Sequence, residues 1–362
     1  MRSTGTYATS TTLGEKVQAF VPRGLPPTKP PLALEALVHL NQTAELALAR
    51  LSGVSGLVPS VDWLLYSAIR KEALLTSQIE GTQATLTDLF NEEAGLAVSN
   101  TDDIEEVTNY LRAFRLVRDN LRHPAGLPIS VRLLCDAHRL LLDGVRGTGN
   151  ASFVPPPPEH VAALLSDMEQ FIHEAEPTLP PLVRIALVHA QFETIHPFLD
   201  GNGRIGRLLI AALLEHWHLL PEPLMYLSGY LKQHQAEYYR RLSNIRDQGD
   251  WEGWVSFFLE GVEAAATQAE RGIVAIASLV AEDRRRLLAS PKAGPASYRL
   301  FEMLTMMPRF TVERVRQALA TSFPTANAAV KVLEDLGIVN EVTGQKKNRS
   351  YSYQRYITLL AL

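Results

Sequence analysis

Apolar residues recur at helical spacing along most of the chain. Ser, Thr or Gly stands at several ends of these segments, where helices commonly begin and stop. The pattern predicts a mainly α-helical fold, with helices over 32–51, 61–80, 86–96, 104–121, 130–142, 159–174, 182–192, 205–217 and 268–288. Residues 208–220 are apolar on nearly every side, so we expect this helix at the centre of the bundle.

The two ends of the chain depart from this pattern. Residues 1–30 lack helical periodicity and include a proline-rich stretch, which predicts an extended strap on the surface. Ser290–Pro295 is the clearest linker, and the segment beyond it is predicted to be a separate unit. Its elements resemble a winged helix–turn–helix, with helices over 298–306, 311–320 and 325–336 and strands over 338–343 and 349–353.

Composition narrows the class of protein only a little. A chain of 362 residues with 46% hydrophobic and 20% charged residues is ordinary for a globular protein, and a net charge of −4 gives no overall nucleic-acid signature. The single cysteine, Cys135, excludes a disulfide framework and is expected to be a small buried hydrophobe. No apolar run approaches a membrane span, so we expect a cytoplasmic protein without a membrane partner.

The densest concentration of chemistry is the stretch from His196 to Arg207, which reads HPFLDGNGRIGR. Helical spacing on both sides, with Asp200 to Asn202 as breakers, predicts a helix, a tight loop and a second helix. Gly201 and Gly203 permit turns that a Cβ would forbid.

A loop that opens into a helix directs free backbone N–H groups and the positive end of the helix dipole at one spot, which suits phosphate. Arg204 and Arg207 share a helix face and can both reach phosphate oxygens. Asp200 offers an oxygen ligand for Mg²⁺, and His196 is placed to take a proton from a hydroxyl. The stretch therefore predicts group transfer from a nucleoside triphosphate to an alcohol, although a tight helix corner with solvated arginines is the simpler alternative.

The same stretch resembles the signature of the Fic family, His-x-Phe-x-Asp/Glu-Gly-Asn-Gly-Arg-x-x-Arg. The residues that match it are His196, Phe198, Asp200, Gly201, Asn202, Gly203, Arg204 and Arg207. The resemblance implies a Fic-type helical bundle that moves AMP from ATP, with Mg²⁺, to a Ser, Thr or Tyr hydroxyl of a protein. A phosphorylating branch of the family has lysine in place of Gly203, so the glycine favours AMP transfer.

The resemblance also implies a role for each residue of the motif. His196 is the implied catalytic base and Asp200 the implied metal ligand. Arg207 is the implied contact to the γ-phosphate. The implied anion cradle consists of Gly201, Asn202, Gly203 and Arg204.

A second family pattern lies upstream, at the end of the helix over 61–80. Glu80 is oddly placed, since a carboxylate at a helix C-terminus opposes the helix dipole. Thr76, Glu80 and Gly81 match the inhibitory pattern Ser/Thr-x-x-x-Glu-Gly/Asn. The resemblance implies that Glu80 pairs with Arg207 and autoinhibits the enzyme by keeping the γ-phosphate away. An exposed pair contributes only about 0–1 kcal/mol, so we expect a sheltered, bidentate pair.

Two further features follow from the family likeness. Tyr239 lies in a segment that resembles the helix lining the adenine pocket, so an adenine contact is expected there, with ordinary aromatic packing as the alternative. Close relatives carry a target-docking flap where this chain passes almost directly from Gly147 to Phe153. We therefore divide the chain into an N-terminal strap and inhibitory-helix region (1–99), a Fic catalytic core (100–265), a connecting helix and linker (266–290) and a winged-helix-like domain (291–362).

Partners and rival functions remain open from the sequence. Residues 291–362 contain ten Lys or Arg and five Asp or Glu, and Lys346, Lys347 and Arg349 lie at the predicted hairpin tip, so DNA is a possible partner of this domain. A dimerisation module is the alternative there. The protein substrate is unknown, self-modification and a homodimer are possible, and the rival functions are a DNA-binding regulator that senses nucleotide and an enzyme that removes AMP from proteins.

Overall fold

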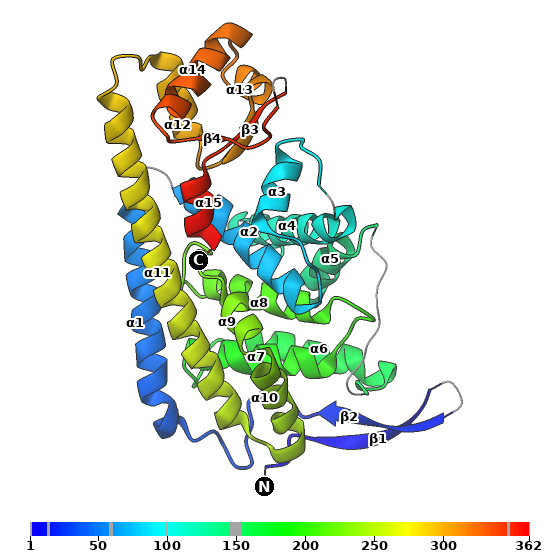
Figure 1. The fold of residues 1–362 in the computed structure, drawn as a ribbon. Helices are drawn as coiled ribbons and strands as arrows, with labels where there is room; N and C mark the ends of the chain where they lie inside the picture. The colour runs from blue at the N-terminus through cyan, green and yellow to red at the C-terminus, as the bar shows by residue number, and fades with distance from the viewer. Residues whose placement is uncertain are drawn as a thin grey trace.

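A computed structural model describes residues 2–12, 15–57, 61–98, 100–144, 154–345 and 348–361. The predicted mainly helical fold is confirmed (Figure 1). Residues 145–153, where relatives carry the flap, and the two predicted tip lysines, Lys346 and Lys347, lie outside these ranges, so the structure tests neither the flap region nor the basic tip. No helix in the described ranges has the length and hydrophobicity needed to cross a bilayer.

The helical body is built around α8, as its apolar sequence predicts. Helix α8 packs against α7, and α2, α4 and α5 also contact it. Long helices α1 and α11 lie side by side along one flank (Figure 1). The helices of the body are α1 (Val38–Val54), α2 (Val61–Ile79), α3 (Leu86–Glu93), α4 (Thr101–Arg122), α5 (Val131–Leu141), α6 (Pro158–Ile172), α7 (Pro181–Ile195), α8 (Asn202–His216), α9 (Leu227–Gln233), α10 (Gln235–Gln248) and α11 (Trp251–Leu288), with short 3₁₀ turns at Leu34–Leu37 and Ser55–Leu57.

The N-terminal segment corrects the prediction of an extended strap. Strands β1 (Gly5–Thr12) and β2 (Glu15–Pro22) pair antiparallel as a hairpin. The segment is rich in threonine and valine, which favour strands, and the ring of Phe20 is buried against that of Tyr7, with 5.3 Å between the ring centroids. Arg2 holds the start of the chain to the body through an ion pair with Glu252.

Helix α11 is longer than the helix predicted over 268–288, because it is continuous over 38 residues from Trp251 to Leu288. It crosses the predicted end of the catalytic core at residue 265. No proline interrupts it, and buried apolar residues recur from Trp251 to Leu287. Cys135 also differs from its prediction, because its side chain is exposed on α5 and not buried.

The C-terminal unit contains α12 (Pro295–Met303), β3 (Arg309–Thr311), α13 (Val312–Ala318), α14 (Phe323–Asp335), β4 (Asn340–Glu341), β5 (Ser350–Ser352) and α15 (Gln354–Ala361). Its strands form an antiparallel sheet in the order β3-β5-β4. Strand β3 and helix α15 were not predicted. Helix α15 returns to the body (Figure 1), where the Tyr356 hydroxyl lies 2.6 Å from that of Ser67 on α2.

Candidate active site

The loop between α7 and α8 is held in one conformation by its own residues. His196 ends α7 with a left-handed backbone (φ 49°), and Gly201 begins α8 with φ 79°. The Asn202 amide clamps the loop, because its Oδ1 accepts from the N–H of Phe198 at 2.9 Å and its Nδ2 donates to the Phe198 carbonyl at 2.7 Å. The predicted helix–loop–helix is therefore present.

Gly203 does not form the turn that the sequence predicted for it. It lies in the first turn of α8 with helical geometry and makes no turn of its own. A Cβ at this position would overlap the Glu80 carboxylate and crowd the Arg207 guanidinium. The glycine therefore leaves room for the Glu80 carboxylate beside α8, and a side chain here would have to displace the ends of Glu80 and Arg207.

His138 of α5 supports the loop from outside, and sequence analysis did not single it out. Its ring stacks on Phe198, with 3.7 Å between ring centroids and an interplanar angle of 7°. Its Nε2 is 2.9 Å from the carbonyl oxygen of Asp200. These two contacts hold the loop on either side of Leu199, whose side chain is 99% exposed.

His196 has the protonation state that a base needs. Burial lowers the pKa of His196, which more than offsets the raising effect of a hydrogen bond to the Glu193 backbone. The imidazole is therefore neutral at pH 7 and can accept a proton. The nearby charges of Glu80 and Asp200 act in the opposite direction and keep the shift moderate.

Arg204 contacts an acid that sequence analysis did not single out. Its NH1 donates to Glu106 of α4 at 2.9 Å, and its NH2 lies 3.7 Å from Asp200. The Arg204 side chain is 3% exposed, so Glu106 is not simply solvated. The ion pair fixes Arg204 beside the loop, because a buried guanidinium requires a nearby acid. The helical spacing of α4 could not reveal this partner, which lies 98 residues away in sequence.

Arg207 is the most enclosed charge of the site. Its side chain is 2% exposed and forms an ion pair with Glu80, the residue that follows α2. Its Nε donates to the Thr76 hydroxyl at 2.6 Å, and its NH2 donates to the Thr76 carbonyl at 3.2 Å. The pair is sheltered, as expected, but it is not bidentate, because only one oxygen of the Glu80 carboxylate accepts from Arg207. The hydroxyl and the carbonyl of Thr76 accept the other hydrogen bonds of the guanidinium.

The electrostatics favour a charged Glu80 in this pair. Burial alone would raise the pKa of Glu80, but the Arg207 guanidinium, with smaller contributions from Arg204 and His196, holds that pKa below its usual range. Gly81 then ends the helix with φ 112°, a conformation that favours glycine. Thr76, Glu80 and Gly81 are thus brought to the α8 side of the site.

Two further acids surround Arg207, and the sequence analysis missed both. Burial raises the pKa of Glu193 to about 7, and its Oε1 has no hydrogen-bond partner among the described residues. A Cβ at Gly206 would overlap that carboxylate. Burial also raises the pKa of Glu72 to about 6, and Glu72 accepts hydrogen bonds from Ser228 at the start of α9. Besides the charged Glu80, Arg207 therefore has two buried acids nearby whose pKa values are raised toward neutrality.

Glu193→Gln is expected to stabilise the protein at pH 8 but not at pH 5. The folded-state pKa of about 7 lies above the ordinary value of 4.5, so the native protein loses stability as pH rises from the lower value through the higher. The neutral amide removes that loss, roughly 1–3 kcal/mol. Urea unfolding of parent and variant at both pH values measures it, and an equal difference at the two pH values would contradict the expected titration.

Tyr239 is the last residue singled out from the sequence, and His189 of α7 packs in the same part of the fold. Tyr239 lies on α10 and is 44% exposed, and charge interactions with Glu80 and Arg207 place it near the site. Its adenine contact stays a prediction. His189 is fully buried, and its Nε2 is 2.9 Å from the Tyr238 hydroxyl, so it is a packing residue of the core. Burial lowers the pKa of His189 to about 3, so this histidine is neutral.

Asp200 is the metal ligand that the resemblance implies. Within the described ranges there is no cluster of three or more His, Cys, Asp or Glu side chains suited to a metal ion. One carboxylate at the mouth of a loop that is predicted to bind phosphate does fit Mg²⁺, which is usually held by one or two carboxylates together with substrate phosphates. The Asp200 carboxylate also accepts the Gly201 N–H at 2.6 Å, which orients it at the start of α8.

Comparison with known proteins places this geometry in a family. The model for the Fic/DOC family N-terminal region matches residues 38–119, and that for the Fic/DOC family matches residues 128–214, which include the α7–α8 loop. Residues 38–119 and 128–214 of the chain therefore match the two parts of a Fic family protein.

Individual relatives agree with the assignment. The chain is 28% identical over 199 residues to "Protein adenylyltransferase Fic" of Drosophila melanogaster and 29% identical over 199 residues to that of Drosophila willistoni. Each alignment covers 51% of this chain, and it covers 39% and 38% of those proteins, so the chain spans about two fifths of their length.

Solved structures share the fold. A Fic family protein from Desulfovibrio desulfuricans G20 aligns with a TM-score of 0.56 and 22% identity, covering 88% of this chain and 95% of that one. Fic-1 from C. elegans aligns with a TM-score of 0.52 and 21% identity, covering 67% of this chain and 75% of that one.

Proposed function

We propose that the protein is an autoinhibited adenylyltransferase that moves AMP from ATP to a Ser, Thr or Tyr hydroxyl of a protein. The observation that carries the proposal is the α7–α8 loop, where a neutral His196 lies beside an anion-binding helix start and a buried arginine. The names of the Drosophila relatives support the same reaction.

The reaction follows from the chemistry of these groups. His196 takes the proton of the target hydroxyl as its oxygen bonds to the α-phosphorus of ATP, and the bond from that phosphorus to the bridging oxygen breaks. Pyrophosphate leaves with the electron pair of that bond, and AMP stays on the target. Gly201, Asn202, Gly203 and Arg204 are assigned to the phosphate oxygens at the start of α8. Mg²⁺ held by Asp200 would neutralise charge on the α- and β-phosphates.

Glu80 is proposed to control this reaction through Arg207. In the structure Nε and one terminal nitrogen of the Arg207 guanidinium are engaged by Thr76 and Glu80, so we propose that these donors are not available to a γ-phosphate. ATP would then bind in an unproductive pose. The test is transfer of label from α-labelled ATP by parent and variant proteins, including the protein itself as acceptor.

We propose that the C-terminal unit is a winged helix. The order α12-β3-α13-α14-β4-β5, with the small sheet β3-β5-β4, supports this assignment. The winged-helix assignment favours a DNA-binding regulator as a second candidate function. The candidate recognition helix α14 offers one cation, Lys331, which forms ion pairs with Glu334 and Asp335. Sequence-specific readout by this helix is therefore not expected.

If this unit contacts DNA, binding should be non-specific and strongly salt-dependent. We expect the full chain to retard a generic duplex at about 50 mM salt and to release it near 200 mM, since phosphate contacts dominate. Lys331→Gln should change little, because that lysine is already paired with two acids. A mobility-shift titration measures both, and no retardation at low salt would remove the DNA-binding candidate.

A further inference from the structure

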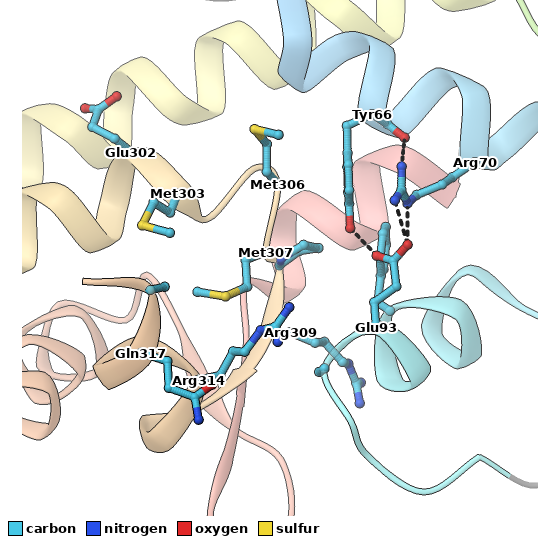
Figure 2. A pocket seen from close by; sticks show the side chains of 14 residues that line it. Tyr66, Arg70, Glu93, Glu302, Met303, Met306, Met307, Arg309, Arg314 and Gln317 are labelled. Carbon is cyan, nitrogen blue, oxygen red and sulfur yellow. Dashed lines mark hydrogen bonds and ion pairs between the residues drawn. The ribbon is translucent and has the colours of Figure 1, made fainter. Parts of the chain in front are cut away.

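A cavity of about 720 Å³ separates α2 and α3 from the C-terminal unit. One wall carries Tyr66 and Arg70 of α2 and Glu93 at the end of α3 (Figure 2). The opposite wall comes from α12, β3 and α13 and the segment between them. None of its lining residues belongs to the α7–α8 loop, so the cavity is separate from the candidate active site.

The apolar part of the cavity is made largely of methionine. Met303, Met306 and Met307 line it, and they are three of the six methionines in the whole chain. Met306 is 47% exposed, so its side chain is accessible to a ligand in the cavity. Methionine is flexible and polarisable, and it is favoured on surfaces that adapt to ligands.

The acids of the cavity are already paired. Glu93 accepts from Arg70 at 2.6 and 2.8 Å and also accepts from the Tyr66 hydroxyl. Glu302 accepts from Arg284 at 2.7 Å. The α2 wall is therefore close to electrically neutral, and Glu302 is tied to a cation outside the cavity.

Two arginines of the opposite wall are left without an acid. Arg309 donates to the side chain of Asn91 at 2.8 Å, and its Nε is shielded from solvent without a hydrogen-bond partner in the described part of the chain. Arg314 is exposed and forms no ion pair with any described residue. Figure 2 shows the two side chains near each other on the side of the cavity below Met307. Asp88 is the one acid whose charge reaches Arg309, and its carboxylate is engaged by Thr85.

We propose that this cavity binds a small organic anion with an apolar body. The acidic group lies between Arg309 and Arg314, and the apolar body lies against the three methionines. The volume is within the range of about 300–1,000 Å³ that suits a small-molecule ligand. This site does not depend on AMP transfer, so its test is independent of the proposed function.

The test uses a probe and a neutral analogue with the same apolar body. The probe is 8-anilinonaphthalene-1-sulfonate, and the analogue is N-phenyl-1-naphthylamine, which lacks the sulfonate. The full chain is labelled with ¹³C at the methionine methyl groups, and spectra are recorded as each compound is added. Met168 and Met225 are buried elsewhere in the body and serve as internal controls.

The sulfonate probe should shift the signals of Met303, Met306 and Met307 to saturation and leave those of the two internal controls in place. Arg314→Gln should weaken binding roughly tenfold, since it removes a charged donor from an exposed position. Arg316→Gln is the matched control, because Arg316 lies on the same helix but pairs with Glu313 and does not line the cavity.

Three results would overturn the proposal. The first is binding that leaves the cavity methionine signals unmoved. The second is equal affinity for the neutral analogue, which would show an apolar cavity without anion recognition. The third is equal loss of affinity in the Arg314→Gln and Arg316→Gln variants, which would reduce the effect to general surface charge.

Discussion

Glu80→Gly is expected to raise AMP transfer from ATP by roughly 10- to 100-fold. A hydrogen bond to a charged group contributes about 1.5–3 kcal/mol. The Glu80 carboxylate makes such a contact with Arg207, whose side chain is 2% exposed. Removing the carboxylate frees one guanidinium nitrogen for the γ-phosphate. The initial rate of label transfer from α-labelled ATP, to the protein itself and to a cell lysate, measures the change.

Two variants separate the gate from a general effect of lost charge. Glu80→Gln keeps the shape of the side chain but weakens its hold on Arg207, so its rate should lie between those of the parent and Glu80→Gly. Glu270→Gln removes an acid that pairs with Arg50 on the opposite flank, at 3.2 Å, and should leave the rate unchanged. Equal transfer by the parent and Glu80→Gly would contradict the proposed gate.

Arg207 supplies a check that does not depend on Glu80 alone. The double variant Glu80→Gly/Arg207→Ala should lose the gain of Glu80→Gly, because the freed arginine is the proposed γ-phosphate contact. A double variant as active as Glu80→Gly would show that the ion pair is structural and that the γ-phosphate is held elsewhere.

The parts of the fold that the sequence predicted are local. Apolar spacing located the helices of the body, and capping residues such as Ser130, whose side chain accepts from the N–H of Leu133 at 3.3 Å, marked where they begin. The α7–α8 loop was predictable for the same reason, since its glycines and its asparagine act within a few residues of one another. The Glu80–Arg207 pair was reached only through the family resemblance, because 127 residues separate the two.

The parts that could not be predicted depend on packing between distant segments. Glu106 is one of many charged residues on its helix, and helical spacing alone does not show that it pairs with Arg204. Glu193 follows Phe192 on a helix that is buried on almost every side, and only the fold shows that its carboxylate faces Gly206 and Arg207. The β1–β2 hairpin was missed because neighbouring prolines suggested an extended chain.

His196→Ala is expected to lower AMP transfer by roughly 10²- to 10⁴-fold in the Glu80→Gly background, the usual contribution of a general base. Nucleotide affinity should persist, because the phosphate contacts assigned to the start of α8 and to Arg207 do not involve the imidazole. The same rate should also fall on acidification only below the ordinary histidine pKa of about 6.5, since burial lowers the pKa of His196.

The Glu80→Gly/His196→Ala protein therefore decides between the enzyme and the regulator. Rapid-quench transfer assays and equilibrium binding of ATP are measured on the same preparation, with Glu80→Gly as the reference. Loss of transfer with retained binding assigns the imidazole to the chemical step. Retained transfer would show that another group takes the hydroxyl proton. If both Glu80→Gly and Glu80→Gly/His196→Ala bind ATP but neither transfers AMP, a nucleotide sensor is favoured. In that case the pocket still binds nucleotide without the inhibitory Glu80 but catalyses no transfer.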